Sequence, residues 1–245
     1  MTRKVLLVTG ASRGIGAATA ILAAQAGWCV AVHYHQNEAA AQSVCDAIMA
    51  KGGDARIFAA DLAVESDIQD LFAQVLKVFE RLDGLVNNVG ITPLLGRVDQ
   101  MDFARLTAIF TTNIAGAFVC AGEAVRAMST RYGHDGGVIV NVSSRAAVLG
   151  SPNRYVDYAA SKAALDALTI GLAKEVAPEN IRVNTVRPGV IDTTIHDKNG
   201  GTSEMSTVPM QRIGTPDEVA EAIIWLLSDA ARYCTGTFID VSGGR

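Results

Sequence analysis

The segment YVDYAASK, residues 155–162, places two tyrosines just ahead of a lysine. It opens an alanine-rich stretch that predicts a helix starting at about Tyr155. Residues four apart share a face of a helix, so Tyr158 and Lys162 point the same way, whereas the residue four beyond Tyr155 is Ala159. The spacing therefore pairs Tyr158, and not Tyr155, with a cation.

A lysine beside a tyrosine changes what the phenol can do. An ammonium roughly 4 Å from a phenolate stabilises it by about 4 kcal/mol at an effective dielectric constant near 20. At about 1.36 kcal/mol per pKa unit, this predicts a pKa for Tyr158 of about 7 instead of about 10, which suits a general acid/base. The same spacing also fits a tyrosine–lysine pair on a solvated helix face, where the attraction is weak.

A glycine-rich turn follows the first apolar run of the chain. TGASRGIG carries Gly10, Gly14 and Gly16 and leads directly into the helical pattern AATAILAAQAG. Backbone N–H groups at such a helix start can approach a pyrophosphate, and the helix dipole favours its charge. The spacing is GxxxGxG and not GxGxxG, so an ordinary strand-to-helix turn, in which glycine supplies a positive φ, remains open.

The elements that would position these residues alternate regularly. Short apolar runs predict strands, and the segments between them carry apolar residues at helical spacing, as in Ile68, Leu71, Phe72 and Val75. This alternation predicts a single-domain, doubly wound (Rossmann) parallel sheet of about seven strands with helices on both faces and ligands at the carboxyl ends of the strands. The predicted strands are KVLLVT, WCVAVHY, ARIFAA, GLVNN, GVIVNVS, IRVNTV and TFIDVS.

Residues 188–213 break this rhythm. They contain two adjacent glycines and a proline without clean periodicity, which is typical of a functional segment inside a compact domain. We expect a substrate lid there. No stretch has the composition of a linker, so residues 1–245 are expected to form one domain.

Composition limits the partners of the chain. A formal net charge of −4 without a long basic run argues against nucleic acid, and no apolar run is seen that would span a membrane. The four cysteines form neither a CxxC pair nor a disulfide framework, which fits a reducing cytoplasm. The four histidines show no metal-ligand spacing, and His33 and His35, which alternate on a predicted strand, are expected at the surface or at the edge of a cofactor site.

Several motifs occur in one order along the chain. After the glycine turn come NNVG (87–90), TTN ending at Asn113, NVSS (141–144), YAASK (158–162) and VRPGVIDT (186–193). This set resembles the short-chain dehydrogenase/reductase family, in particular its 3-oxoacyl carrier-protein reductase and glucose dehydrogenase-like members. The resemblance covers the chain from Val5 to the terminal DVSGGR.

The resemblance implies a set of catalytic residues. Tyr158 matches the acid/base, Lys162 the lysine that lowers the pKa of that tyrosine and holds the nicotinamide ribose, and Asn113 the asparagine that positions a water. Ser144 matches the serine that binds the substrate oxygen. Because the interval from Ser144 to Tyr158 is one residue longer than in many relatives, Ser143 stays the alternative.

The cofactor site is implied in the same way. The predicted residues are Gly10, Ser12, Arg13, Gly14, Ile15 and Gly16 at the phosphates, Tyr34, His35 and Asn37 after the second strand, Asp61 and Leu62 at the adenine, Asn88 and Gly90 at the ribose, and Tyr158, Lys162, Pro188, Gly189, Ile191 and Thr193 at the nicotinamide.

The end of the second strand bears on which nucleotide is bound. Enzymes specific for NAD(H) commonly place an acidic residue there, which would repel a 2′-phosphate. Here the position is Tyr34, and Arg13 offers a guanidinium that suits phosphate. We therefore expect NADP(H), with NAD(H) as the alternative.

The sequence thus predicts a cytoplasmic oxidoreductase that transfers a hydride between NADP(H) and a small-molecule carbonyl or alcohol. A homodimer or homotetramer is expected, because in the family the small-residue helix after Tyr158 builds a subunit interface. Two other functions stay open: a catalytically silent nucleotide-binding regulatory protein and an NAD(H)-preferring sugar or polyol dehydrogenase. The intact set of four implied catalytic residues argues against the silent protein.

Overall fold

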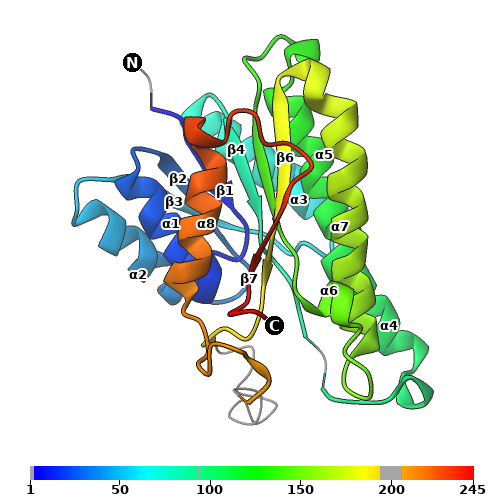
Figure 1. Ribbon diagram of the computed structural model, residues 1–245. Coiled ribbons are helices and arrows are strands. Elements are labelled where there is room, and N and C mark those ends of the chain that lie inside the picture. Colours follow the sequence, from blue (N-terminus) through cyan, green and yellow to red (C-terminus); the bar gives the residue numbers. More distant parts are fainter. Residues whose placement is uncertain (1–2, 93, 194–205) are drawn as a thin grey trace.

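Seven parallel strands form one sheet in the order β3-β2-β1-β4-β5-β6-β7 in the computed structural model, which describes residues 3–92, 94–193 and 206–245 (Figure 1). Apolar residues fill the central strands, and β1 and β4 are buried throughout. The strands are β1 (Val5–Val8), β2 (Cys29–Tyr34), β3 (Asp54–Ala59), β4 (Gly84–Asn87), β5 (Gly137–Val142), β6 (Ile181–Pro188) and β7 (Phe238–Val241). Each of the seven predicted runs is a strand.

Helices cover both faces of the sheet (Figure 1). One apolar layer joins the sheet to α1, α2 and α8, and a second joins it to α3, α5 and α7. The helices are α1 (Gly14–Gln25), α2 (Glu38–Met49), α3 (Glu65–Phe79), α4 (Phe103–Phe110), α5 (Gly116–Met128), α6 (Ala146–Leu149), α7 (Val156–Val176) and α8 (Pro216–Leu227). The predicted doubly wound fold is confirmed.

Local sequence accounts for the helix limits. In α3 the buried side chains Ile68, Leu71, Phe72 and Val75 recur at helical spacing and pack on the sheet. Helix α8 begins with a capping box, in which the side chains of Thr215 and Glu218 each accept a hydrogen bond from the other residue's backbone N–H. Such caps are typically worth about 1 kcal/mol.

The side of the sheet on which the chain adds new strands changes at β1, so that β1 and β4 are neighbours. From β1 it builds β2 and β3 on one side, then returns to place β4 on the other side of β1. In doubly wound sheets ligands bind at the carboxyl ends of the strands beside this reversal. The glycine turn and the end of β4 both lie there, so the fold brings the predicted phosphate and ribose residues together.

The stretch from Phe103 to Met128 is helical throughout but not α-helical throughout. Residues Thr111–Ala115 form a π-helical turn between α4 and α5. By length and composition this stretch could cross a membrane. Its Cys120, Ala124 and Met128 are instead buried in the apolar layer against the sheet.

The predicted lid lies only partly within the described residues. Residues 188–193 continue from β6 towards the site, and residues 206–213 lead into α8. The middle of the predicted lid, residues 194–205, lies outside the described residues.

Candidate active site

The glycine turn leaves the N-terminus of α1 without a side-chain cap. Arg13 occupies the capping position but makes no side-chain capping hydrogen bond, and no acidic residue stands in the first turn of this helix. Gly10 and Gly14 adopt φ of +64° and +55°, which favour glycine. A helix start with free N–H groups and no neighbouring carboxylate in its first turn suits an anion such as a phosphate.

The turn is held close to β4. The Asn88 side chain donates to the carbonyl oxygens of Thr9, at 2.8 Å, and Gly10, at 3.3 Å. A methyl group on Gly16 would overlap the Gly10 carbonyl oxygen, so Gly16 allows α1 to pack against the turn. Gly16 lines no cavity at the strand ends, although the resemblance implies a place for it at the phosphates. Its contribution is close packing.

A cavity of about 520 Å³ lies over the ends of β1, β2, β3 and β4. Most of the predicted nucleotide residues line it, and so does His33, which was expected at the surface or at the edge of a cofactor site. The lining residues outside these predictions are Gln36, Ala60, Ala63, Val89, Ile91 and Thr112. The predicted residues that line it are Gly10, Ser12, Arg13, Gly14, Ile15, His35, Asn37, Asp61, Leu62, Asn88, Gly90 and Thr193. Its size and lining fit the adenosine and phosphate part of a dinucleotide.

Residues at the end of β2 alternate between the cavity and the core. His33 and His35 face the cavity, whereas Tyr34 is 9% exposed and packs in the apolar layer beneath α1 and α2. The prediction that Tyr34 lines the nucleotide site is therefore wrong, because neighbouring residues of a strand point to opposite faces. Burial together with Glu38 raises the pKa of Tyr34.

Two polar residues of this rim already have partners in the protein. Asn37 caps α2, since its Oδ1 accepts a hydrogen bond from the Ala40 N–H at 3.0 Å. Asp61 accepts from the Ala63 N–H at 2.9 Å and lies 3.6 Å from His35 Nε2. Both side chains keep further acceptor positions for a ligand.

A second, smaller pocket of about 110 Å³ adjoins the first, and Ile15, Asn88, Gly90 and Thr193 line both. Ser144, Tyr158 and Lys162 converge on it from the end of β5 and the first turns of α7. The predicted nicotinamide residues Pro188, Gly189 and Ile191 form another part of its wall. The implied catalytic groups thus lie beside the implied nucleotide groups.

The two neighbouring serines have different partners. The hydroxyl of Ser143 donates to the Lys162 carbonyl oxygen at 3.0 Å, which ties β5 to α7. Ser144 forms a hydrogen bond with the Tyr158 side chain and also accepts from the Ala146 N–H at 3.1 Å. The structure thus places Ser144, and not Ser143, against the phenol.

Burial dominates the titration of the tyrosine and the lysine. It raises the pKa of Tyr158 to about 12, which the Ser144 hydrogen bond partly offsets, and it lowers the pKa of Lys162 to about 8. The lysine Nζ lies 5.8 Å from the centre of the Tyr158 ring and donates to the Val142 carbonyl oxygen at 2.9 Å. The expected pKa of about 7 for Tyr158 is therefore wrong for this arrangement, in which the ammonium is bound to the backbone.

Gly90 makes room for the lysine. A Cβ at this position would lie 3.0 Å from Lys162 Nζ, tighter than an ordinary contact, so a larger residue would push the ammonium away. The ammonium also carries two further N–H groups besides the one donated to Val142.

Asn113 supports the pocket from behind. It lies in the π-helical turn, is fully buried, and forms paired hydrogen bonds with the backbone of Ile91 at 2.8 and 3.0 Å. Its Nδ2 also approaches the Ser161 hydroxyl at 3.0 Å. Asn113 lines neither pocket, and through Ile91 it fixes the segment that follows Gly90.

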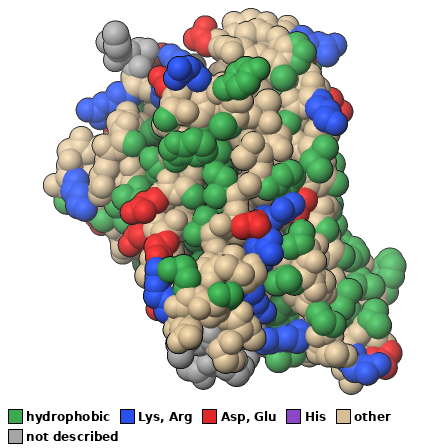
Figure 2. Space-filling view, viewed as in Figure 1, with side chains coloured by type: hydrophobic (Ala, Val, Ile, Leu, Met, Phe, Trp, Pro, Cys, Tyr) green, Lys and Arg blue, Asp and Glu red, His purple; other side chains and the backbone are tan. Residues whose placement is uncertain are grey.

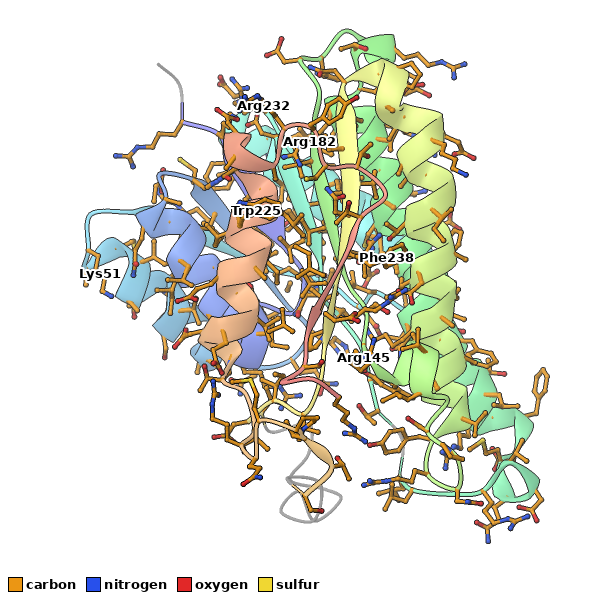
Figure 3. The ribbon with its side chains drawn as sticks, viewed as in Figure 1. Lys51, Arg145, Arg182, Trp225, Arg232 and Phe238 are labelled. Carbon is orange, nitrogen blue, oxygen red and sulfur yellow. The ribbon has the colours of Figure 1, made fainter. Side chains whose placement is uncertain are left out.

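Further residues outside the predicted set shape the small pocket. Tyr155 stands edge-on to Tyr158 with 5.8 Å between ring centres, and it lines the pocket. Arg145, on the loop after β5, pairs with Asp240 at 2.5 Å and reaches the backbone of Arg245 near the C-terminus (Figure 3). The sequence left two interpretations of Tyr155 open, as a neighbour of the cleft nearly one turn before Tyr158 or as packing at the helix start. The NVSS motif predicted the strand end but gave no signal for Arg145.

A buried ion pair holds the start of α7. Arg105 of α4 donates to the Asp157 carboxylate at 2.7 and 3.3 Å, and the Asp157 side chain is fully buried. Asp157 also accepts from the Tyr158 N–H at 2.9 Å.

Among the described residues no group of three or more His, Cys, Asp or Glu side chains could hold a metal ion.

Comparisons with known proteins agree with this geometry. Residues 10–245 match the family model described as enoyl-(acyl carrier protein) reductase. The chain is 49% identical to an uncharacterised oxidoreductase of Escherichia coli, over 98% of this chain and 99% of that one. It is 38% identical to a 3-oxoacyl carrier-protein reductase of Synechocystis, over 100% and 97%.

A solved structure shares the fold as well as the sequence. The crystal structure of a short-chain dehydrogenase from Burkholderia cenocepacia, in complex with NADP, has a TM-score of 0.92 and 34% identity and covers 98% of this chain and 97% of its own. Sequence and structure therefore confirm the predicted resemblance. The chain belongs to the short-chain dehydrogenase/reductase family and is an oxidoreductase.

Proposed function

We propose that the protein is an NADP(H)-dependent carbonyl reductase or alcohol dehydrogenase with Tyr158 as its general acid/base. The observation that carries the proposal is the convergence of Ser144, Tyr158 and Lys162 on a small pocket that shares a wall with the large nucleotide cavity. A carbonyl in the small pocket would lie against two hydroxyls and beside the nucleotide.

When bound, NADPH supplies a hydride to the carbonyl carbon. The Ser144 and Tyr158 hydroxyls bind the carbonyl oxygen and stabilise the negative charge that develops there. Tyr158 then gives its proton to this oxygen, which completes the alcohol, and alcohol oxidation is the reverse. Lys162, positively charged below its pKa of about 8, favours the tyrosinate that this proton transfer leaves.

The preference for NADP(H) is supported by Arg13. This exposed side chain lines the large cavity, and a guanidinium matches the geometry of a 2′-phosphate. Among the described lining residues the only carboxylate is Asp61, which already accepts a backbone hydrogen bond. The related Burkholderia structure is an NADP complex.

Direct titration tests the nucleotide preference. NADPH and NADH are titrated side by side, and NADPH is expected to bind at least tenfold more tightly. Arg13→Ala should abolish most of that difference. Arg56→Ala is the matched control, because Arg56 is an exposed arginine that pairs with Asp54 away from the cavity. Tighter binding of NADH to the unmodified protein would refute the preference.

Turnover is tested with a panel of ketones, aldehydes and alcohols, followed by the absorbance of the nucleotide. Activity that disappears in Tyr158→Phe supports the proposal. Tight NADPH binding without turnover on any carbonyl or alcohol would instead favour a nucleotide-binding regulatory protein.

Self-association and a cytoplasmic location complete the proposal. Apolar side chains gather on the surface along α8 (Figure 2), and Trp225 of this helix is 43% exposed. Phe118 on α5 and Ile170 on α7 are each 46% exposed. These patches suit a homodimer or homotetramer, which light scattering can measure.

The cytoplasmic location is supported by the cysteines. All four are free thiols and three of them are buried, which suits a reducing compartment.

A further inference from the structure

His33 is buried and hydrogen-bonded at both ring nitrogens, and it takes no part in the proposed proton transfer. Its Nδ1 accepts from the Gly10 N–H at 2.9 Å, and its Nε2 lies 3.1 Å from the Ala60 carbonyl oxygen. A carbonyl oxygen only accepts, so Nε2 carries the proton and Nδ1 is the acceptor. The contacts therefore define one neutral tautomer of a side chain that is 1% exposed.

The imidazole joins three strand ends at the large cavity. Gly10 follows β1, His33 stands on β2 and Ala60 follows β3. The backbone carbonyl of His33 also accepts from the Ala11 N–H at 2.8 Å. Two consecutive residues of the glycine turn are thus fixed to His33, one through its side chain and one through its backbone.

We infer that His33 is a positioning residue for nucleotide binding, which holds the Gly10 N–H and thereby the phosphate turn in its binding geometry. The inference rests on the proposed function only in assuming that the cavity takes NADP(H). Without the imidazole, the Gly10 N–H has no acceptor, and the turn has to be ordered by the nucleotide itself. That cost appears as weaker binding.

The titratable groups around the imidazole do not replace these contacts. His35 and Asp61 stand at the ends of β2 and β3, and Arg13 lies in the turn, but both ring nitrogens of His33 are bonded to backbone atoms. Burial lowers the pKa of His33 to about 4. The imidazole is therefore neutral at the pH of ordinary assays, and its Nδ1 is available as an acceptor.

Three substitutions separate the two hydrogen bonds. His33→Asn keeps an acceptor near the position of Nδ1, His33→Gln keeps a donor near that of Nε2, and His33→Leu removes both. The dissociation constant for NADPH should stay within about threefold in the asparagine variant. It should rise about tenfold in the glutamine and leucine variants, which corresponds to about 1.4 kcal/mol.

Tyr34→Phe is the matched control, because Tyr34 is the next residue of β2 and faces away from the cavity. It should leave NADPH binding unchanged. In the His33 variants the loss should appear mainly in the KM for NADPH and much less in kcat, because the reacting groups line the other pocket. Thermal unfolding of each variant is measured alongside. If the leucine variant does not fold, the difference in NADPH affinity between the asparagine and glutamine variants tests the inference.

A spectroscopic readout is independent of activity. In ¹⁵N NMR spectra of histidine-labelled protein, the His33 signals should show a protonated Nε2 and an unprotonated Nδ1. A proton on Nδ1 would overturn the inference. So would an asparagine variant that binds NADPH as weakly as the glutamine variant does, or NADPH affinities that correlate with the thermal stability of the variants and not with the presence of an acceptor for the Gly10 N–H. NADPH binding without turnover would refute the proposed reaction and leave this inference standing, whereas a wild-type protein that does not bind NADPH would refute both.

Discussion

Replacing Lys162 by methionine should stabilise the protein while removing its activity. The side chain is 3% exposed, and burial lowers its pKa from 10.5 to about 8. At about 1.36 kcal/mol per pKa unit, keeping the ammonium charged at neutral pH costs about 3 kcal/mol of folding free energy. Methionine has a similar length and no charge, but it leaves the Val142 carbonyl oxygen without its donor, which costs about 1–2 kcal/mol. The expected net gain at pH 7 is about 1–2 kcal/mol.

The pH dependence identifies the cause. Because the pKa of Lys162 is depressed in the folded protein, the stability linked to this group is complete above about pH 10.5. The free energy of unfolding then decreases as the pH falls from about 10.5, and below about pH 8 this contribution is fully lost. Between pH 7 and pH 9.5 the wild type should gain about 2 kcal/mol from this source, whereas the methionine variant should gain none.

Urea unfolding at both pH values, without added nucleotide, measures these differences. Lys174→Met is the control, because Lys174 is an exposed lysine of the same helix and the same substitution there removes no buried ammonium. A methionine variant that is less stable than the wild type at pH 7, or a gap between the two proteins that does not vary with pH, would refute this reasoning.

Other substitutions test the site more locally. Tyr158→Phe should lower kcat by at least about 100-fold with NADPH binding nearly unchanged, and Tyr155→Phe should have a far smaller effect; equal losses in kcat would contradict the assignment of the acid/base. Arg105→Leu leaves the fully buried Asp157 carboxylate without its cation, so urea unfolding should show a loss of about 3–5 kcal/mol. A loss below about 1 kcal/mol would mean that the pair contributes little. Gly16→Ala adds a methyl that overlaps a backbone oxygen of the turn, and NADPH titration should show at least tenfold weaker binding; an unchanged affinity would show that the turn can adjust.

Local patterns were enough to predict the sheet. Strands such as β5 are apolar on both faces, and this is the signal that a parallel sheet covered by helices requires. The spacing of Tyr158 and Lys162 likewise follows from helix geometry, and both side chains reach the same pocket.

Contacts between distant segments could not be predicted. The partners of His33 are backbone atoms of Gly10 and Ala60, which no spacing along the chain reveals. The pKa of Tyr158 depends on burial and on the carbonyl that takes up the Lys162 ammonium, neither of which is local. The burial of Tyr34 could have been predicted from strand alternation. Its neighbours His33 and His35 face the cavity, so Tyr34 must point to the opposite face of the sheet.

The π-helical turn at Thr111–Ala115 limits how the length of this chain can vary during evolution. Such a turn holds one residue more than an α-helical turn, so deleting Ile114 or Ala115 would produce a continuous and more regular helix from Phe103 to Met128. The helix before the deletion would then rotate by about 100° relative to the helix after it. Asn113 would turn away from the Ile91 backbone, so a deletion that favours the helix would disturb the pocket wall.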